Sequence, residues 1–194
     1  MGYLLWEYSN PEDDEIRTVT VNTQNKYNSK VVFWNALKMC SVSKHEADSL
    51  RESKRKRLPD YIYRFDSTLE FRVYLALTKM YGASRVKRQI SVPLIPHGIC
   101  YPKGKAWKID FAVVNSFDSS KYAFYVEAKG RITPEFRNVL PILEHTNPDV
   151  FNRLFLVFGT KIPTENRVVA NLLQGKNHHR VHTLKSFSSL TRLI

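Results

Sequence analysis

Three charged residues, Asp110, Glu127 and Lys129, lie within two apolar segments near the middle of the chain. The segments cover residues 107–114 and 122–130, and both have the alternating pattern of β-strands. Side chains two residues apart on a strand point to the same face, so Glu127 and Lys129 are expected to be neighbours. A hard divalent cation needs carboxylate ligands, and an ammonium group beside them can neutralise the charge of a phosphate.

The surroundings of these charges distinguish them from an ordinary surface ion pair, which is what an isolated Glu-x-Lys tripeptide usually forms. Asp110 and Glu127 lie inside apolar runs, where a carboxylate is costly unless a counter-charge or a metal ion compensates it. Residues 115–120 are polar and turn-forming, so the two segments are predicted to form a hairpin. Strict alternation groups four side chains on one face of the first strand: Trp107, Ile109, Phe111 and Val113.

The order Glu70, Asp110, Glu127-Ala128-Lys129 resembles the signature of the PD-(D/E)XK nuclease superfamily, with Ile109 where that pattern usually has proline. A narrower resemblance, to the phage junction-resolving endonuclease I family, covers roughly residues 65–159. It rests on four short matches: Ser67 to Glu70, Asp110-Phe111, Val126 to Gly130, and a closing segment with Arg137, Pro148 and Arg153 to Phe158.

The resemblance implies a metal-dependent DNA endonuclease with a restriction-endonuclease-like α/β core, in which helices flank a mixed central β-sheet. Asp110, Glu127 and the backbone carbonyl of Ala128 would bind Mg²⁺, with Mn²⁺ able to substitute, and Glu70 would join them or hold a second ion. Lys129 would position or help to deprotonate the attacking water and stabilise the charge on the phosphate. The implied substrates are four-way junctions and other branched DNA, cut by a symmetric homodimer.

Glu70 also has a structural explanation. Residues 67–70 form a capping box at the start of a helix predicted to run from Ser67 to about Tyr81 and to end at Gly82. The Glu70 carboxylate would then reach back to the Ser67 amide. The two roles can coexist, so both remain open from the sequence.

The chain carries a net charge of +12, which suits a phosphate-binding surface and indicates nucleic acid as the partner. The residues expected to contact DNA are Arg137, Lys108, Lys87, Arg88, Arg55, Lys56 and Arg57. A plain surface role is the alternative for Arg137, since Asn138 stands where the family has a second basic residue. The basic run 51–57 could equally be a solvated helix end, a linker or, in a eukaryotic host, a nuclear-import signal.

The chain is predicted to divide into an N-terminal appendage, residues 1–60, and a nuclease core, residues 61–194. Apolar spacing predicts that the appendage is largely helical between residues 29 and 57, with Ser43 capping a second helix, and it could bind DNA or a partner. The core is predicted to contain strands over 86–95 and 151–158 and helices that begin at Thr133 and Asn166; Pro141 is expected to kink or end the former helix. Residues 97–105 form a loop that either touches DNA or is simply exposed. The histidines 178, 179 and 182 are read as a polar loop entering a strand.

Composition excludes several classes of protein. Cys40 and Cys100 form neither a disulfide framework nor a zinc motif, which fits a reducing compartment. No apolar run is long enough to cross a membrane, so a cytoplasmic protein of a bacterial or phage-infected cell is expected. Two other functions stay open. One is a site-specific, homing-type or restriction-like endonuclease on duplex DNA, and the other is a non-catalytic nucleic-acid-binding or assembly factor that retains the core.

Overall fold

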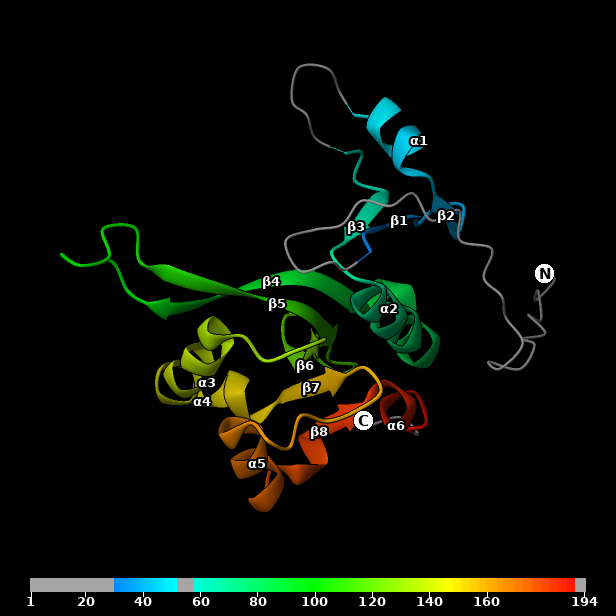
Figure 1. The fold of residues 1–194 in the computed structure, drawn as a ribbon. Helices are drawn as coiled ribbons and strands as arrows, with labels where there is room; N and C mark the ends of the chain where they lie inside the picture. Colours follow the sequence, from blue (N-terminus) through cyan, green and yellow to red (C-terminus); the bar gives the residue numbers. More distant parts are fainter. Residues whose placement is uncertain (1–29, 52–57, 191–194) are drawn as a thin grey trace. The chain divides into compact units, whose positions relative to one another are not determined.

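The computed structural model describes residues 30–51 and 58–190, and the chain divides into two compact units, residues 1–66 and 67–194 (Figure 1). The boundary falls after Asp66, later than the predicted position near residue 60. The reason is strand β3 (Ile62–Phe65), which pairs antiparallel with β1 (Val32–Asn35) and so belongs to the first unit.

The first unit contains a small antiparallel sheet in the order β2-β1-β3, where β2 is Cys40–Val42, followed by helix α1 (Lys44–Ser49). The prediction of a largely helical segment is wrong for residues 32–42, which form two strands and a turn. The Asn35 side-chain oxygen accepts hydrogen bonds from the amides of Leu37 (3.0 Å) and Lys38 (2.9 Å), and this turn reverses the chain. The predicted cap at Ser43 is confirmed, since its hydroxyl accepts from the Glu46 amide.

The second unit is built on a mixed five-stranded sheet in the order β4-β5-β6-β7-β8. Strands β4, β5 and β6 are antiparallel, whereas β6, β7 and β8 run parallel. The bounds of the strands are β4 Val86–Ile95, β5 Lys105–Val114, β6 Tyr122–Lys129, β7 Leu154–Phe158 and β8 Val181–Thr183. The predicted hairpin of β5 and β6 is confirmed. Residues 178–180 form a short 3-10 turn that leads into β8, in line with the reading of the histidines as a loop entering a strand.

Helices cover both faces of this sheet. Their bounds are α2 Thr68–Tyr81, α3 Pro134–Thr146, α4 Pro148–Asn152, α5 Arg167–Gln174 and α6 Leu184–Ser188, with a 3-10 turn at Ala83–Arg85. The predicted starts are confirmed by side-chain caps at Ser67, Thr133 and Asn166. Pro141 does not end α3, which continues to Thr146, and the predicted strand over 151–158 begins only at Leu154 because α4 precedes it.

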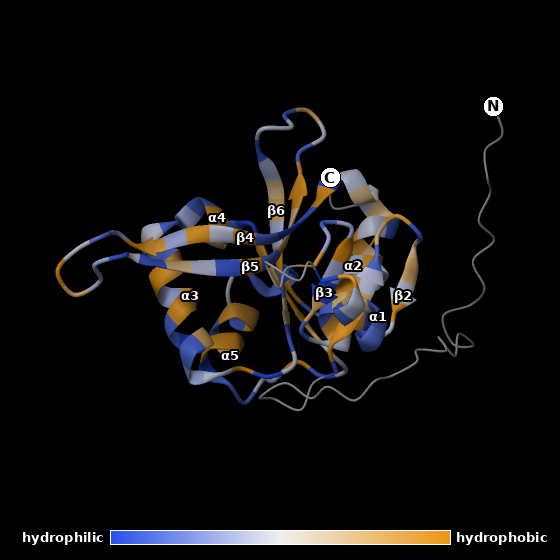
Figure 2. Cartoon of the chain, turned by 90° about the horizontal axis from the view of Figure 1, so that it is seen from above, coloured by the Kyte–Doolittle hydropathy of each residue, from blue (hydrophilic) through white to orange (hydrophobic). Residues whose placement is uncertain are grey.

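Side chains that alternate along the strands pack into two apolar layers, one on each face of the sheet. On one face, rings of α2 and α6 join those of the strands, as in the edge-on contacts of Phe124 with Tyr81 and Phe155. On the other face, Leu154, Leu156 and Phe158 of β7 join the apolar sides of α3, α4 and α5. Figure 2 shows hydrophobic residues on α3 and α5 interleaved with polar ones, as expected for helices with one buried face.

Strand β5 changes the face on which its side chains lie near Asp110. Trp107 contacts Phe136 of α3 (ring centroids 5.8 Å apart), whereas Phe111 stacks on Tyr74 of α2 (6.2 Å). Ile109 and Ala112 both belong to the α3 layer, which a strictly alternating strand could not achieve. The predicted common face for residues 107 to 113 is therefore wrong, and the change of face coincides with a positive φ of 53° at Gln89 on the neighbouring strand.

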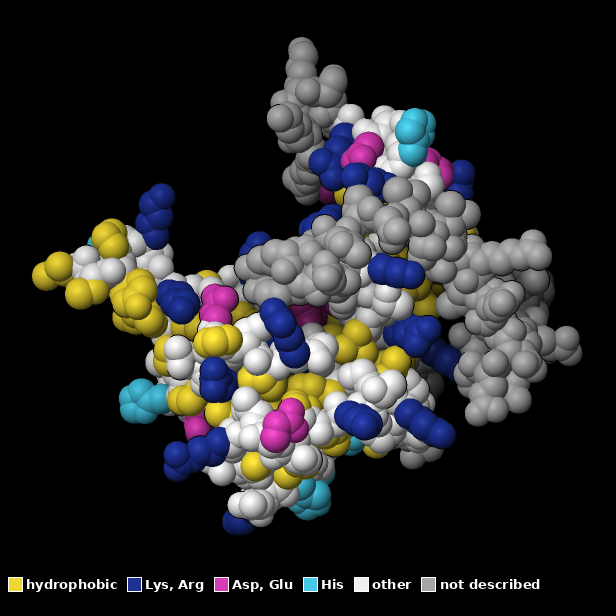
Figure 3. Space-filling view, viewed as in Figure 1, with side chains coloured by type: hydrophobic (Ala, Val, Ile, Leu, Met, Phe, Trp, Pro, Cys, Tyr) yellow, Lys and Arg dark blue, Asp and Glu magenta, His cyan; other side chains and the backbone are white. Residues whose placement is uncertain are grey.

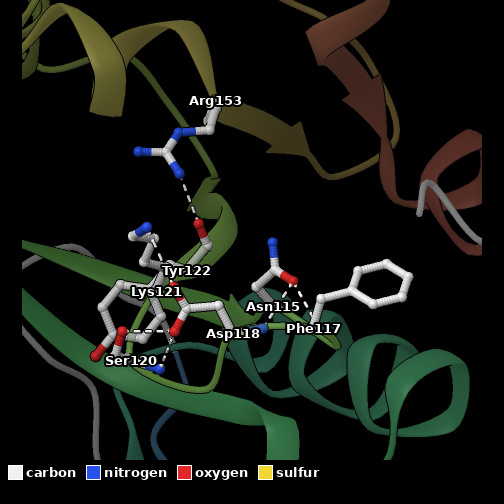
Figure 4. Close-up of polar contacts among 7 residues, drawn as sticks. All are labelled: Asn115, Phe117, Asp118, Ser120, Lys121, Tyr122 and Arg153. Carbon is white, nitrogen blue, oxygen red and sulfur yellow. Dashed lines mark hydrogen bonds and ion pairs between the residues drawn. The ribbon is translucent and has the colours of Figure 1, made fainter.

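The turn between β5 and β6 is held by its own side chains (Figure 4). The Asn115 side-chain oxygen accepts from the amides of Phe117 (2.8 Å) and Asp118 (3.3 Å), and Lys121 pairs with Asp118. At the start of β6, Arg153 donates to the Tyr122 carbonyl at 2.6 Å. The Phe117 ring points away from this network and is 95% exposed.

Cys40 and Cys100 are both exposed and free. Among the helices of the described residues, none combines the length and apolar character needed to cross a membrane.

Candidate active site

The candidate site lies where β5 and β6 stop pairing through their backbones. The last backbone partners toward this end are Phe111 and Val126. Beyond them the Asp110 amide donates to the Glu127 carboxylate at 3.1 Å, and the Ala128 amide donates to the Asp110 carboxylate at 2.9 Å. The two carboxylates thus accept the amide hydrogen bonds that backbone carbonyls accept elsewhere in the β-ladder. Because each one accepts from the opposite strand, both are fixed between the strands.

Lys129 completes the cluster, as the two-residue spacing predicts. Its Nζ lies 2.5 Å from Glu127 Oε1, and the same ammonium lies 4.8 Å from the centre of the Phe136 ring on α3. An ammonium group over an aromatic face is held by the ring quadrupole as well as by the carboxylate. Phe136, which sequence reasoning did not single out, therefore helps to orient Lys129.

Glu127 is almost completely buried, with 1% of its surface exposed. Burial raises the pKa of its carboxyl from 4.5 to about 8, and the Asp110 carboxylate adds to this effect, whereas Lys129 opposes it. Near neutral pH the carboxyl therefore retains its proton for much of the time. Removing the proton places a second negative charge beside Asp110, and a cation at this position would relieve that cost.

Lys129 responds to the same charges in the opposite sense. Burial lowers the pKa of its ammonium, but Glu127, Asp110 and Glu70 together outweigh burial, and the net effect is to raise the pKa above 10.5. The side chain is consequently a stable ammonium at neutral pH. It is suited to hold an anion and not to accept a proton.

Glu70 reaches the cluster by two routes. Its amide donates to the Ser67 hydroxyl at 3.0 Å, so the predicted helix cap is present, and only 5% of the residue is exposed. Its carboxylate accepts a hydrogen bond from the Gln89 side chain at 3.4 Å and contributes to the electrostatic field at Lys129. The Ser67 half of the predicted capping box is therefore present, and the Glu70 carboxylate hydrogen-bonds with Gln89.

Gln89 was expected only as part of a polar strand face that could lie beside the acids, and it was not named as a site residue. It lies on β4 opposite Asp110, between the paired residues Arg88 and Ile90, and its φ of 53° is in the left-handed region that disfavours non-glycine residues. Such a conformation persists only where the surroundings impose it, and it is common at functional sites. The available sequence signal was its place on the polar face of a strand otherwise rich in Lys and Arg.

The predicted DNA contacts are distributed over three elements. Lys87 and Lys108 are exposed on β4 and β5, Arg88 is half-buried on β4, and Arg137 is exposed on α3. The predicted contacts at residues 55–57 lie outside the described residues.

The donors at this site suit a hard divalent cation. Asp110 and Glu127 supply carboxylate oxygens, and burial together with the Asp110 carboxylate raises the pKa of Glu127 despite the opposing charge of Lys129. Within residues 30–51 and 58–190, no three His, Cys, Asp or Glu side chains group closely enough to hold a metal ion. Glu70 therefore does not form a three-carboxylate group with the other two; it accepts a hydrogen bond from Gln89 and acts on Lys129 through its charge.

Comparisons with protein-family models, with curated proteins and with solved structures find no match. The resemblance to the PD-(D/E)XK pattern therefore stays a prediction that depends on the order and geometry of these residues.

The raised pKa of Glu127 predicts a pH-dependent stability. The folded chain holds this proton more tightly than the unfolded chain, so its contribution to the free energy of unfolding should fall as pH rises from 4.5 to about 8. Glu127→Gln removes this titration. Relative to the wild type, the variant should gain ~2–5 kcal/mol between about pH 5 and about pH 8.5, as measured by urea unfolding. Glu135→Gln, at an exposed position on α3, is the control and should follow the wild type; parallel profiles for Glu127→Gln and wild type would refute the assignment.

The positive φ of Gln89 predicts the sign of a second effect. Glycine inside a strand usually costs about 0.5–1 kcal/mol, but at position 89 it relieves the left-handed conformation. Gln89→Gly should therefore leave the free energy of unfolding unchanged or raise it by up to about 1 kcal/mol. Ser91→Gly, on the same face of β4, is the matched control and should be destabilised. Equal losses in the two variants would contradict a strained Gln89.

Proposed function

We propose that the protein is a metal-dependent DNA endonuclease with a restriction-endonuclease-like core, which hydrolyses phosphodiester bonds with Mg²⁺ or Mn²⁺. The observation that carries the proposal is the reciprocal hydrogen bonding of Asp110 and Glu127 at the point where β5 and β6 separate, with Lys129 in contact with Glu127. A buried carboxyl whose ionisation is disfavoured by burial and by a neighbouring carboxylate is typical of sites that require a cation.

Each residue has a distinct part in this proposal. Asp110, Glu127 and the carbonyl of Ala128 hold the divalent ion, which when bound supplies a Lewis acid and lowers the pKa of a coordinated water. Lys129, which remains an ammonium, attracts and orients the scissile phosphate and stabilises its additional negative charge. Gln89 holds the Glu70 carboxylate, and Glu70 adds negative charge at the edge of the site. Phe136 fixes the direction of the Lys129 side chain.

The proposed substrate is DNA, with branched molecules such as four-way junctions preferred and cut by a symmetric dimer. The net charge of +12 supports a polyanionic partner. The exposed Lys87 and Lys108 lie on β4 and β5, the two strands next to and carrying Asp110, and add positive charge near the site.

Asp110→Asn and Lys129→Ala should each lower DNA cleavage by at least about 10³-fold, because one removes a metal-binding charge and the other the phosphate-binding ammonium. Cleavage of a junction, a linear duplex and a single strand should be compared with Mg²⁺ present. Arg131→Ala, an exposed basic residue just after β6, is the control for loss of positive charge and should cleave at a rate near that of the wild type.

Binding separates loss of chemistry from loss of structure. Asp110→Asn should bind DNA in EDTA as the wild type does, and it should lose the heat of Mn²⁺ binding in calorimetry. A fully active Asp110→Asn enzyme would refute the assignment of the site. A wild-type protein that binds DNA, but that neither binds Mn²⁺ nor cuts DNA, would instead be a non-catalytic DNA-binding factor.

A further inference from the structure

Strands β4 and β5 extend beyond the rest of the sheet as a two-stranded arm. Strand β6 pairs with β5 only between Phe111 and Val114, whereas β4 and β5 remain paired as far as Ile95 and Lys105. We define the arm as residues 90–109 and its tip as residues 96–104. Figure 1 shows the arm running past α3, with its tip beyond the helices of the same unit.

One face of the arm is covered and the other faces solvent. Ile90, Val92 and Leu94 pack into the apolar layer of α3, and the Asn147 side chain donates to the Pro93 carbonyl at 2.7 Å. The opposite face has exposed Ser91 and Lys108 as cross-strand partners. The arm is therefore held against the core along its length, and only its outer face and its tip are open to a ligand.

The tip is closed by backbone hydrogen bonds. Gly98 and Tyr101 exchange two of these, at 3.0 and 3.2 Å, and the Gly104 amide donates to the Tyr101 carbonyl at 2.8 Å. Gly104 has a φ of 66°, and a Cβ there would lie 2.8 Å from the Ile95 carbonyl oxygen, so only glycine fits. This closed turn presents Ile99, which is 99% exposed, and Tyr101, which is 45% exposed. The turn thus holds two apolar side chains, two residues apart, toward solvent.

The charge of the surrounding chain identifies the partner. No Asp or Glu occurs between Glu70 and Asp110, whereas Lys and Arg recur throughout this stretch, including Lys103 at the tip and Lys105 next to it. Figure 3 shows hydrophobic side chains gathered at the end of the arm, with Lys and Arg beside them. A two-stranded ribbon fits a nucleic-acid groove, and exposed apolar or aromatic side chains insert between bases or stack on them.

We propose that the arm binds nucleic acid: Lys103, Lys105 and Lys108 contact phosphates, while Ile99 and Tyr101 insert against unstacked bases. The choice of DNA, and of branched DNA in particular, rests on the proposed nuclease function. Lys105 and Asp110 are about 17 Å apart along β5, at roughly 3.4 Å for each residue. This is about half a turn of duplex, so one DNA molecule can contact both the tip and the candidate site.

The apolar tip is tested by binding in EDTA, where no cleavage occurs. Fluorescence anisotropy should be measured with a labelled four-way junction and the matching linear duplex. Ile99→Ala combined with Tyr101→Ala should weaken junction binding by about tenfold or more, with a smaller effect on the duplex. The matched control is Phe117→Ala, at another highly exposed ring on a hairpin tip of the same unit. Its binding should equal that of the wild type, and equal effects at the two tips would overturn the proposal.

The phosphate contacts of Lys103 and Lys105 are tested by the salt dependence of DNA binding. Replacing Lys103 and Lys105 by Gln should weaken junction and duplex alike and reduce the slope of log affinity against log salt by about 2, one unit for each lost phosphate contact. The apolar double variant should leave this slope unchanged. A salt slope that does not change in the lysine variant would show that the tip does not lie on the phosphate backbone and would overturn the proposal.

The two cysteines allow a direct test of contact. Cys100 lies at the tip and Cys40 lies in the first unit, so Cys40→Ser leaves a single thiol, on the arm. A photoactivatable azidophenacyl group on Cys100 should crosslink to the junction in a larger yield than to the matching linear duplex. Absence of a Cys100 crosslink in a protein that cuts DNA would refute the arm and leave the nuclease intact.

The remaining outcomes also decide the proposal. A Cys100 crosslink in a protein that does not cut would support the arm and refute the nuclease. Ile99-dependent binding to vesicles of anionic lipid without binding to DNA would identify a membrane surface. Loss of a dimer in Ile99→Ala would identify a second copy of the chain. Either of these two results would overturn the proposal.

Discussion

The site depends on one constraint, which is that two carboxylates occupy the places of backbone carbonyls where β5 and β6 separate. Asp110 and Glu127 each accept an amide hydrogen bond from the opposite strand, so neither can move without breaking the local pairing. A fully buried carboxylate is otherwise expensive, and its cost here appears as the raised pKa of Glu127. With Asp110 and Glu127 ionised and Lys129 protonated, the pair keeps one uncompensated negative charge, and Glu70 adds to the negative field at Lys129.

Sequence reasoning succeeded where the period of a regular element determined the outcome. The two-residue spacing placed Glu127 and Lys129 together, and the caps at Ser67 and Thr133 located the starts of α2 and α3. It failed where the backbone conformation departed from the regular two-residue alternation of a strand. Gln89 entered the site through a left-handed backbone that no pattern marks, and the change of face in β5 opposite Gln89 separated Trp107 from Phe111.

The prediction of helices in the N-terminal segment failed for a different reason. Val32, Phe33, Ala36 and Leu37 match helical spacing, but such a short apolar run is equally compatible with a strand. The β-branched and aromatic residues at 32–34, followed by Asn35, were the competing signal, because asparagine readily forms turns through its side chain. Leu37 then lies exposed on the turn and not in a helical apolar face.

The arm and Asp110 share one continuous strand, β5, so the position of the arm is fixed relative to that carboxylate. Strand β5 runs without interruption from Lys105 to Asp110, and α3 supports both regions, since Phe136 contacts Trp107 of the arm and also the Lys129 ammonium. A helix that contacts both holds the arm at a fixed distance from the site. If bases are engaged at the tip, the phosphate delivered to Lys129 is determined by the length of β5, so the fold itself would set the separation between the contacted bases and the cut.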